Sequence, residues 1–342
     1  MPRAAILGGT GDIGYAVANR LLADNWTIIS TGRNRAHFPL SLAKKGVRFE
    51  VADGGDSRSL AKVLAGGADL LVDCVCYDAV GARMLLPHLA NISRTVMISS
   101  KAIYVDASGN HSNSDTPPSF AYPIDEEQPT MRPNGLDPDS RMGYGANKVA
   151  AEETLLDSGF LVTILRPSKI HGVHARRPRE WVFVRRALER RSPLLVSAQR
   201  SGVDHPSAAA NIAALIATVA PLSGNHILNI ADPDAPSGMQ IAHIVADYLG
   251  WLFDVKVVTD PQDRWLHPWD TRYAITLDTR RAEQLGYRPA GNYATTVKAE
   301  LRWLKALAHN SPTVPFGDDP FFAPYFDYPG EDRLLARAHN RS

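Results

Sequence analysis

The chain has few cysteines, almost no net charge and no long apolar run. Cys74 and Cys76 are the only cysteines among its 342 residues, which excludes a disulfide framework and is typical of a reducing compartment. Its 37 basic and 36 acidic residues leave a formal net charge of +1, so no overall field favours nucleic acid or an anionic membrane. The first apolar run, residues 4–9, is far shorter than the ~18 residues that cross a membrane. We therefore expect a soluble, cytoplasmic protein with no nucleic-acid or membrane partner.

Composition excludes several fold classes, and the order of the apolar segments indicates an α/β protein. Hydrophobic residues make up 44% of the chain and charged residues 21%, which excludes disordered, collagen-like and coiled-coil proteins. Strand-like and helical segments alternate through the first half. The expected strands are 4–7, 26–31, 47–51, 70–75, 95–99 and 161–166, and the expected helices are 13–22, 59–64, 80–89 and 144–156. This alternation predicts a doubly wound parallel sheet with helices on both faces.

A glycine-rich turn joins the first expected strand to the first expected helix. Residues 8–14 read Gly-Gly-Thr-Gly-Asp-Ile-Gly, a GxxGxxG spacing. Glycine lets the chain turn tightly, bring backbone N–H groups up to a pyrophosphate and pack the helix closely on the sheet, while the helix N-terminus attracts the anion. We predict that the following residues bind the diphosphate of a dinucleotide: Gly8, Thr10, Gly11, Asp12, Ile13 and Gly14.

The end of the second expected strand favours NADP(H), with NAD as the weaker candidate. Folds that prefer NAD usually carry an acidic residue about 20 positions beyond the glycines, and Gly32 takes that place here. Arg33, with Arg35 nearby, could pair with a 2′-phosphate, although both arginines could simply be solvated. Asp53, at the end of the third expected strand, could contact the adenine amino group or be an ordinary turn aspartate.

A catalytic group is predicted from two further motifs. Tyr144 and Lys148 stand four residues apart at the start of an expected helix, so their side chains project from the same face. A lysine ammonium near a phenol lowers the pKa of the phenol, which lets Tyr144 exchange a proton while hydride moves to or from a nicotinamide. Ser100 follows an expected strand, at the sheet edge where such folds bind ligands, and could hydrogen-bond the reacting oxygen.

These motifs together resemble an extended short-chain dehydrogenase/reductase of the NAD-dependent epimerase/dehydratase family. The resemblance covers roughly residues 4–308. Besides the glycines, Tyr144 and Lys148, it rests on the runs Ser99-Ser100-Lys101-Ala102-Ile103-Tyr104 and Leu165-Arg166-Pro167, the latter followed by His171-Gly172. It implies that Ser100 is the family's catalytic serine or threonine and that Lys148 also contacts the cofactor. It further implies a C-terminal lobe that binds substrate, often a nucleotide sugar.

The chain also departs from that family at informative positions. Family 4,6-dehydratases carry an Asp-Glu pair after the catalytic threonine, where this chain has Lys101 and Ala102, so dehydration by that mechanism is disfavoured. Lys169 stands near where many sugar-nucleotide members carry asparagine. We expect an NADP(H)-dependent oxidoreductase that acts on a secondary alcohol or ketone. A sugar-nucleotide epimerase with a retained NAD(P) and a non-catalytic NADP-binding protein are the alternatives.

The chain is predicted to divide into a dinucleotide-binding domain, a smaller lobe and a tail. Residues 1–168 form the Rossmann domain, on which the segment 200–232 packs back. Residues 169–199 and 233–309 form the C-terminal α/β substrate lobe. The tail, 310–342, holds five prolines among six aromatic residues. We expect it to dock against the body, with a cover over the active site or a homodimer contact as alternatives.

One segment interrupts the alternation of strands and helices. Residues 105–142 are rich in Pro, Ser, Asn, Asp and Gly and show no clear period. A stretch of this length without regular structure is usually functional when it lies inside a compact domain. We therefore expect a functional loop or lid there.

The net charge conceals a basic segment. Residues 166–200 hold nine arginines and one lysine against Glu180 and Glu189, a local charge of +8. Guanidinium groups pair bidentately with phosphates, so we expect one or two of these residues to bind a small anionic substrate and the others to be solvated. The candidates for substrate binding are Lys101, Lys169, Arg179 and Arg200.

Three histidines in the second half suggest zinc, but the local sequence does not support it. His171, His174 and His205 lack a paired cysteine or an acidic residue at metal-ligand spacing. We therefore expect no metal site, and assign these side chains structural or substrate-contact roles.

Overall fold

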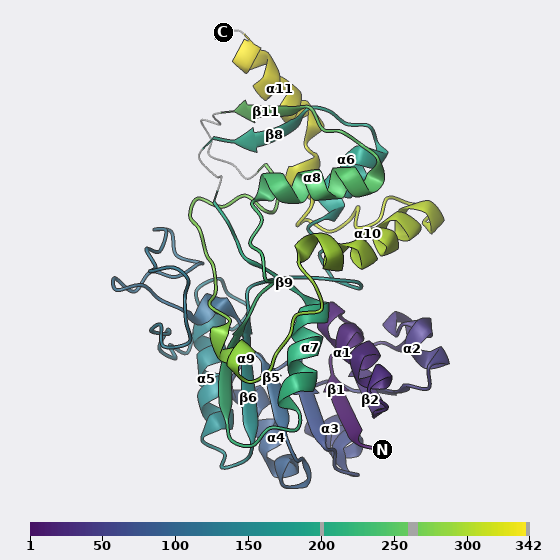
Figure 1. Cartoon of the computed structure of the whole chain (residues 1–342), viewed down its shortest axis with the longest axis vertical. Helices are drawn as coiled ribbons and strands as arrows, with labels where there is room; N and C mark the ends of the chain where they lie inside the picture. Colours follow the sequence, from purple (N-terminus) through teal and green to yellow (C-terminus); the bar gives the residue numbers. More distant parts are fainter. Residues whose placement is uncertain (199–201, 259–265, 340–342) are drawn as a thin grey trace.

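The computed structural model describes residues 1–198, 202–258 and 266–339, and its centre is a seven-stranded parallel sheet (Figure 1). The strand order is β10-β6-β5-β4-β1-β2-β3. The strands are β1 (Arg3–Leu7), β2 (Thr27–Gly32), β3 (Arg48–Val51), β4 (Leu70–Asp73), β5 (Thr95–Ile98), β6 (Val162–Pro167) and β10 (His226–Ile230). The fold class expected from the sequence is confirmed.

The order of the strands reverses at β1, which pairs with β2 on one side and with β4 on the other. Ala4 faces Ile28 in one neighbour and Leu70 in the other, and the strand interiors are apolar and buried. In open α/β sheets the crevice beyond the carboxyl ends of the strands at such a reversal is where ligands bind. The fold therefore places the glycine-rich turn after β1 at that crevice.

Two layers of helices cover the sheet. Helices α1 and α7, which contact each other, cover one face of the sheet. Helices α3, α4 and α5 cover the other face. The helices of this part are α1 (Asp12–Ala23), α2 (Leu40–Lys44), α3 (Ser57–Leu64), α4 (Ala79–Leu85), α5 (Tyr144–Leu156) and α7 (Ala209–Val219), with short 3₁₀ turns η1 (Arg35–His37), η2 (Leu86–Asn91) and η3 (Lys101–Ile103). Asp56 caps α3 through the backbone N–H of Arg58 and Ser59, as an N-cap aspartate should.

A smaller lobe lies above the sheet in Figure 1 and has its own apolar core. Trp181, Phe183 and Trp269 are among its buried side chains. Its elements are α6 (Trp181–Leu188), β8 (Leu194–Ser197), α8 (Gly238–Leu249), β11 (Val255–Val258) and α10 (Tyr293–Asn310). The strands β7 (Lys169–His171) and β9 (Pro206–Ala208) pair with each other, and α9 (Arg280–Gln284) packs near β10. Several of these elements are too short to be predicted from the sequence pattern.

The proline-rich tail docks on the lobe. It contains η4 (Ala323–Phe326) and α11 (Tyr328–His339). Phe322 is buried among the side chains of the lobe core. Arg186 of α6 forms an ion pair with Glu331, and Arg191 is 2.7 Å from Asp332. The tail is therefore packed by both apolar and charged contacts.

The segment between η3 and α5 is largely irregular but well anchored. The Asp106 carboxylate accepts hydrogen bonds from the backbone N–H groups of Ser108, Asn110 and Ser119. Tyr273 donates its hydroxyl to the carbonyl of Ser112 at 3.0 Å. None of the helices in the described part of the chain is long and apolar enough to cross a membrane.

Candidate active site

The turn between β1 and α1 is built so that only glycine fits at several positions. Gly8 has φ +82°, in the left-handed region that disfavours side chains. A Cβ at Gly14 would lie 2.5 Å from the Gly9 Cα and 2.6 Å from the Gly8 carbonyl oxygen. The Gly9 N–H donates to the Thr31 carbonyl at 2.8 Å, which ties the turn to β2. The turn is thus closely packed at the carboxyl end of β1.

The start of α1 offers an anion site. Gly11 is its N-cap and supplies no side-chain cap, so the first N–H groups of the helix point toward the crevice with the positive end of the helix dipole. Asp12 accepts the backbone N–H of Ile13 at 2.8 Å, and burial raises the pKa of its carboxyl. The Ile13 N–H is thus taken by Asp12, and the other N–H groups of this uncapped helix N-terminus fit the diphosphate of a dinucleotide.

The end of β2 carries no carboxylate. A Cβ at Gly32 would lie 2.8 Å from the Thr10 methyl group, so the position is closely packed. Arg33 is exposed, whereas Arg35 donates to the Phe49 carbonyl at 2.8 Å and stacks over the Phe49 ring. Both arginines are exposed, and Arg35 is the one that is held against β3 by these contacts. Asp53 is exposed and accepts the Gly55 N–H at 3.0 Å.

Ser100 and Tyr144 lie together at the carboxyl edge of the sheet. Ser100 is the N-cap of η3 and accepts the Ala102 N–H at 3.1 Å. Burial raises the pKa of the Tyr144 hydroxyl, and a hydrogen bond with Ser100 opposes that rise. The strand end and the helix start, which are far apart in the sequence, thus bring the two hydroxyls into contact.

Lys148 lies one turn along α5 from Tyr144 and is buried. Its ammonium donates to the carbonyl of Cys76 at 2.7 Å and to that of Ile98 at 2.9 Å. The same nitrogen is 4.5 Å from the centre of the Tyr77 ring and 6.0 Å from that of Tyr144. Burial lowers the pKa of this ammonium. Two carbonyl groups of the sheet edge therefore fix a cation beside the Tyr144 phenol.

A cavity of about 730 Å³ lies between the sheet and the lobe. Asp12, Ser100 and Tyr144 line one side. Phe321 and Tyr325 of the tail line it as well. Ser112 and Asn113, from the irregular segment 105–142, also contribute to the wall. The cavity has the size of a small-molecule site.

Three basic side chains of the cavity form a compact cationic group. Lys101 and Lys169 share the Asp204 carboxylate, and the Lys169 contact measures 3.0 Å. Lys169 also donates to the Pro268 carbonyl at 2.7 Å. Arg179 donates to the carbonyl of Ile170 at 3.1 Å, and burial lowers the pKa of its guanidinium. Burial and the nearby Arg179 lower the pKa of Lys101 to about 7 and that of Lys169 well below its usual range. A bound anion would favour the charged forms of both side chains, so the group suits an anionic ligand.

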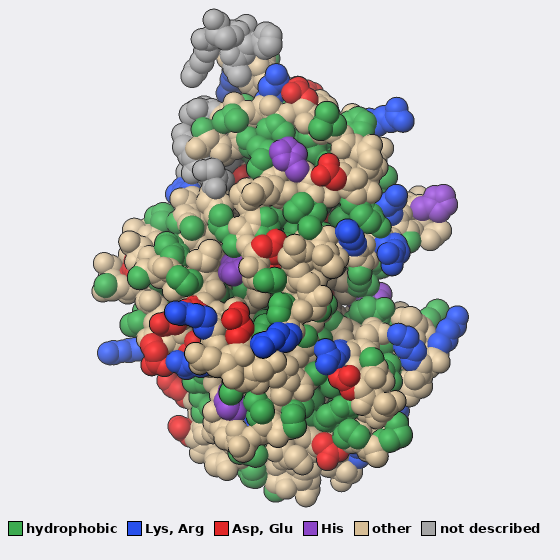
Figure 2. Space-filling model, in the orientation of Figure 1, with side chains coloured by type: hydrophobic (Ala, Val, Ile, Leu, Met, Phe, Trp, Pro, Cys, Tyr) green, Lys and Arg blue, Asp and Glu red, His purple; other side chains and the backbone are tan. Residues whose placement is uncertain are grey.

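Most of the basic segment is neutralised within the protein. Arg166 binds Glu152, Arg177 binds Asp319 and Arg185 binds Glu189, while Arg186 and Arg191 pair with α11 as described above. The expectation that the residues of this segment outside the site are solvated is therefore corrected for Arg166 and Arg186, which are buried in ion pairs. On the face shown in Figure 2, basic side chains are interspersed with acidic ones. Arg200, a predicted substrate ligand, lies outside the described residues.

The three histidines have different surroundings. His174 packs edge-on against Tyr15, with ring centres 4.6 Å apart. His205 accepts the backbone N–H of Leu277 at 3.1 Å and contacts the carbonyl of Asp232. His171 is buried beside two glutamates, Glu180 and Glu300. Both glutamates come from other elements, so a search for neighbouring ligands in the sequence missed them.

Asp204 is the main residue of the cavity that the sequence analysis did not identify. It sits in the run Gly-Val-Asp-His, which matches no motif that we examined. Phe321 and Tyr325 belong to the tail, for which a cover over the active site is one of the alternatives given by the sequence. These residues reach the cavity through long-range contacts, for which the local sequence holds no signal.

Comparison with known proteins gives one family match and many similar folds. The model of the NAD-dependent epimerase/dehydratase family matches residues 4–231. No curated protein sequence matches the chain.

Three solved structures illustrate the likeness of the fold. UDP-N-acetylglucosamine 4-epimerase from Bacillus cereus has 19% identity and a TM-score of 0.68, covering 92% of this chain and 99% of that one. UDP-glucose 4-epimerase from Thermotoga maritima, solved with UDP-glucose, has 14% identity and a TM-score of 0.69, covering 89% and 99%. dTDP-glucose 4,6-dehydratase from Bacillus anthracis, solved with NAD, has 16% identity and a TM-score of 0.68, covering 90% and 98%.

Proposed function

Because the chain belongs to the NAD-dependent epimerase/dehydratase family, we propose that it transfers hydride between NADP(H) and a secondary alcohol or ketone of an anionic, nucleotide-sugar-like substrate. The observation that carries the proposal is the hydrogen bond between Ser100 and Tyr144, in a cavity that Asp12 of the glycine-rich turn also lines, with the buried Lys148 ammonium 6.0 Å from the centre of the Tyr144 ring. A nicotinamide cofactor in that crevice would supply or accept the hydride.

Each of the three residues has a distinct task. Tyr144 gives a proton to the carbonyl oxygen during reduction, or takes it from the alcohol during oxidation. Ser100 hydrogen-bonds the same oxygen and orients it. The hydrogen bond with Ser100 opposes the effect of burial on the pKa of Tyr144, and the Lys148 ammonium, 6.0 Å from the centre of the Tyr144 ring, would stabilise the phenolate electrostatically. The two backbone carbonyls that hold Lys148 keep this charge in place.

The preference for NADP(H) rests on the edge of β2. Gly32 brings no negative charge there, and the exposed Arg33 is free of the contact to β3 that holds Arg35. Asp12, at the start of α1, contributes its backbone to the diphosphate site.

Replacing Arg33 by alanine tests this preference. The Kd of NADPH should rise about 10- to 100-fold, as expected for the loss of a charge-assisted phosphate contact, while the Kd of NADH stays within about threefold. Fluorescence titration of the reduced cofactors measures both. Arg20→Ala, which removes an exposed arginine paired with Asp24, is the matched control. A wild-type protein that binds NADH more tightly than NADPH would contradict the preference.

The cationic group of Lys101, Lys169 and Arg179 supports an anionic substrate. All three side chains line the cavity that also holds Tyr144. The Lys101 and Lys169 side chains are only 12% and 13% exposed, so a bound anion would be shielded from water and its attraction strengthened.

A substrate screen followed by a Lys169→Met variant tests this assignment. Nucleotide sugars and nucleosides are ranked by thermal shift in the presence of NADP, since a ligand stabilises the folded state. For the best anionic substrate, Lys169→Met should raise KM about 10- to 100-fold. Lys298→Met, at an exposed position of α10, should leave KM unchanged. If Lys169→Met and Lys298→Met have equal KM values, Lys169 does not bind the substrate.

Epimerisation with a retained cofactor is a second candidate, because the fold is similar to those of sugar-nucleotide 4-epimerases. The two activities share Tyr144, Lys148 and Ser100 but differ in whether the cofactor leaves after each turnover. Absorbance of the purified protein in the reduced-nicotinamide band, followed by denaturation and identification of the released cofactor, separates them. Tightly bound NAD without turnover of added NADPH would favour the epimerase and overturn the reductase.

A further inference from the structure

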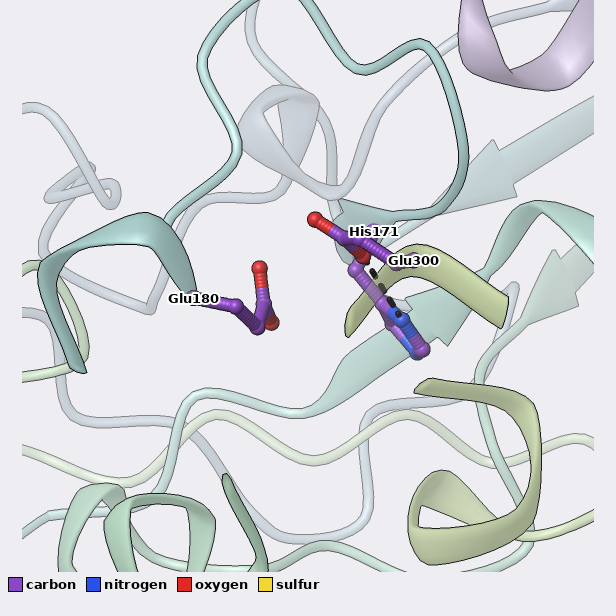
Figure 3. A group of neighbouring side chains, drawn as sticks. All are labelled: His171, Glu180 and Glu300. Carbon is purple, nitrogen blue, oxygen red and sulfur yellow. Dashed lines mark ion pairs between the residues drawn. The ribbon is translucent and has the colours of Figure 1, made fainter. Parts of the chain in front are cut away.

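Three buried side chains outside the proposed active site converge where the lobe meets the sheet. His171 ends β7, Glu180 precedes α6 and Glu300 lies on α10. One ligand atom from each lies within 4.8 Å of those from the other two, and all three residues are at most 2% exposed. Figure 3 shows the Glu180 carboxylate directed toward the pair formed by His171 and Glu300.

The imidazole of His171 lies between the carboxylates of Asp232 and Glu300. Its Nε2 is 2.9 Å from the Asp232 carboxylate. Asp232 in turn accepts the Ala208 N–H at 2.6 Å and the Asn211 amide at 2.8 Å, so the ring orientation is fixed. Its Nδ1 lies 3.6 Å from a Glu300 oxygen, in an ion pair longer than a normal hydrogen bond. Against the effect of burial, Asp232 and Glu300 raise the pKa of His171 to about 10, so a metal ion at Nδ1 would displace a proton. A carboxylate on the far nitrogen is the usual support of a histidine that binds metal.

Three of the four carboxylate oxygens of Glu180 and Glu300 also lack a hydrogen-bond donor within normal distance. Both carboxylate oxygens of Glu300 and the Oε2 of Glu180 are buried and accept no hydrogen bond, whereas the Glu180 Oε1 accepts the Tyr293 hydroxyl at 2.8 Å. Buried polar atoms without partners are costly and rare in native proteins. Four donor atoms of this cluster, including the His171 Nδ1, therefore face one another without a ligand among the described residues.

A divalent cation would balance the charges of the cluster. Asp232, Glu180 and Glu300 are three carboxylates, and Arg179 is the nearby cation. With a neutral His171, one divalent ion makes the sum zero. Without an ion, the same balance needs two protons, one on His171 and one shared by the two glutamates. Exchange of a metal ion for protons is the general behaviour of such sites.

We propose that His171 Nδ1, Glu180 and Glu300 bind one divalent transition-metal ion, with zinc the best match to one imidazole and two carboxylates. Ligand atoms around a four-coordinate zinc lie roughly 3.4 Å apart, so a small inward movement of these side chains forms the site. The ion joins β7 on the sheet side to α6 and α10 of the lobe. It lies next to Arg179 and so supports one wall of the substrate cavity.

The test uses the full-length protein treated with EDTA and then titrated with Zn²⁺. We expect about one zinc per chain, a rise of several degrees in Tm, and release of about two protons per ion near neutral pH. Calorimetry in buffers of different ionisation enthalpy measures the protons. Co²⁺ should bind at the same site and give visible absorption bands. These readouts are independent of enzymatic activity.

Variants separate this site from surface binding. Glu300→Gln keeps the shape of the side chain and should weaken Zn²⁺ binding at least tenfold, and His171→Gln should do the same. His243→Gln removes an exposed imidazole of α8 and should leave binding unchanged. If Zn²⁺ and Co²⁺ neither bind nor raise the Tm of the wild type, the cluster is a proton-sharing network and the proposal fails. Binding that survives Glu300→Gln also overturns it.

Discussion

Tyr144→Phe is expected to lower kcat by about 100- to 10,000-fold, the usual contribution of a positioned general acid or base. The hydroxyl of Tyr144 contacts Ser100 in the cavity, and phenylalanine removes the proton donor but keeps the ring. The Kd of NADPH should stay within about threefold, because the ring is separate from the glycine-rich turn. Steady-state oxidation of NADPH with the substrate from the screen measures kcat, and fluorescence titration measures the Kd.

Tyr248→Phe is the matched control, because this residue packs on the lobe core and does not line the cavity. It should change kcat by less than about twofold. A Tyr144→Phe protein that retains full biological activity would show that proton transfer is not its task, and would favour a non-catalytic protein that binds the cofactor.

Glu152→Ala should reduce the free energy of unfolding by about 3–5 kcal/mol, since removing one partner leaves a buried charge unpaired. Glu152 on α5 is 2.6 Å from the Arg166 guanidinium of β6, and both side chains are buried. It also accepts the hydroxyl of Ser99, next to Ser100. Arg166 stacks over Tyr104, whose hydroxyl donates to Asn229 at 2.7 Å.

Glu153→Ala provides the control at the adjacent, exposed position of the same helix. Its effect should be within about 0.5 kcal/mol, as for most surface substitutions. Urea unfolding followed by circular dichroism measures both variants. A loss of less than about 1 kcal/mol in Glu152→Ala would mean that water or a neighbouring group compensates the arginine, and that the pair contributes little to stability.

Short local motifs were enough to predict the glycine-rich turn and most of the candidate active site. The GxxGxxG run and the Tyr144/Lys148 spacing each lie within a few residues, so the turn and the helix face follow from elementary geometry. Ser100 lies at the end of a strand and Tyr144 at the start of a helix. In a parallel sheet the strands end, and the helices that follow them begin, at the same edge, so the two residues are expected to lie close together. The alternation of strands and helices predicted the sheet, because each helix connects two strands that run in the same direction.

The pairing of distant charges could not be predicted. The count of basic residues in 166–200 is correct, but Arg186 and Arg191 meet acidic residues of α11 that lie far along the chain. Asp204 and Glu300 join their clusters in the same way. Such contacts depend on how the lobe and the tail fold over the sheet, and no periodicity or spacing encodes that arrangement.

The cavity wall has a consequence for how this protein could be re-engineered. The match to the family model ends at residue 231, and Phe321, Tyr325, Asp270 and Tyr273 line the cavity from beyond that point. The ligand space is therefore shared: Lys101, Lys169 and Arg179 come from the stretch that also holds the proposed chemistry, and these four side chains come from the stretch after it. Chimeras in which residues 233–339 are exchanged between relatives would keep the residues of the proposed hydride transfer and bind different ligands.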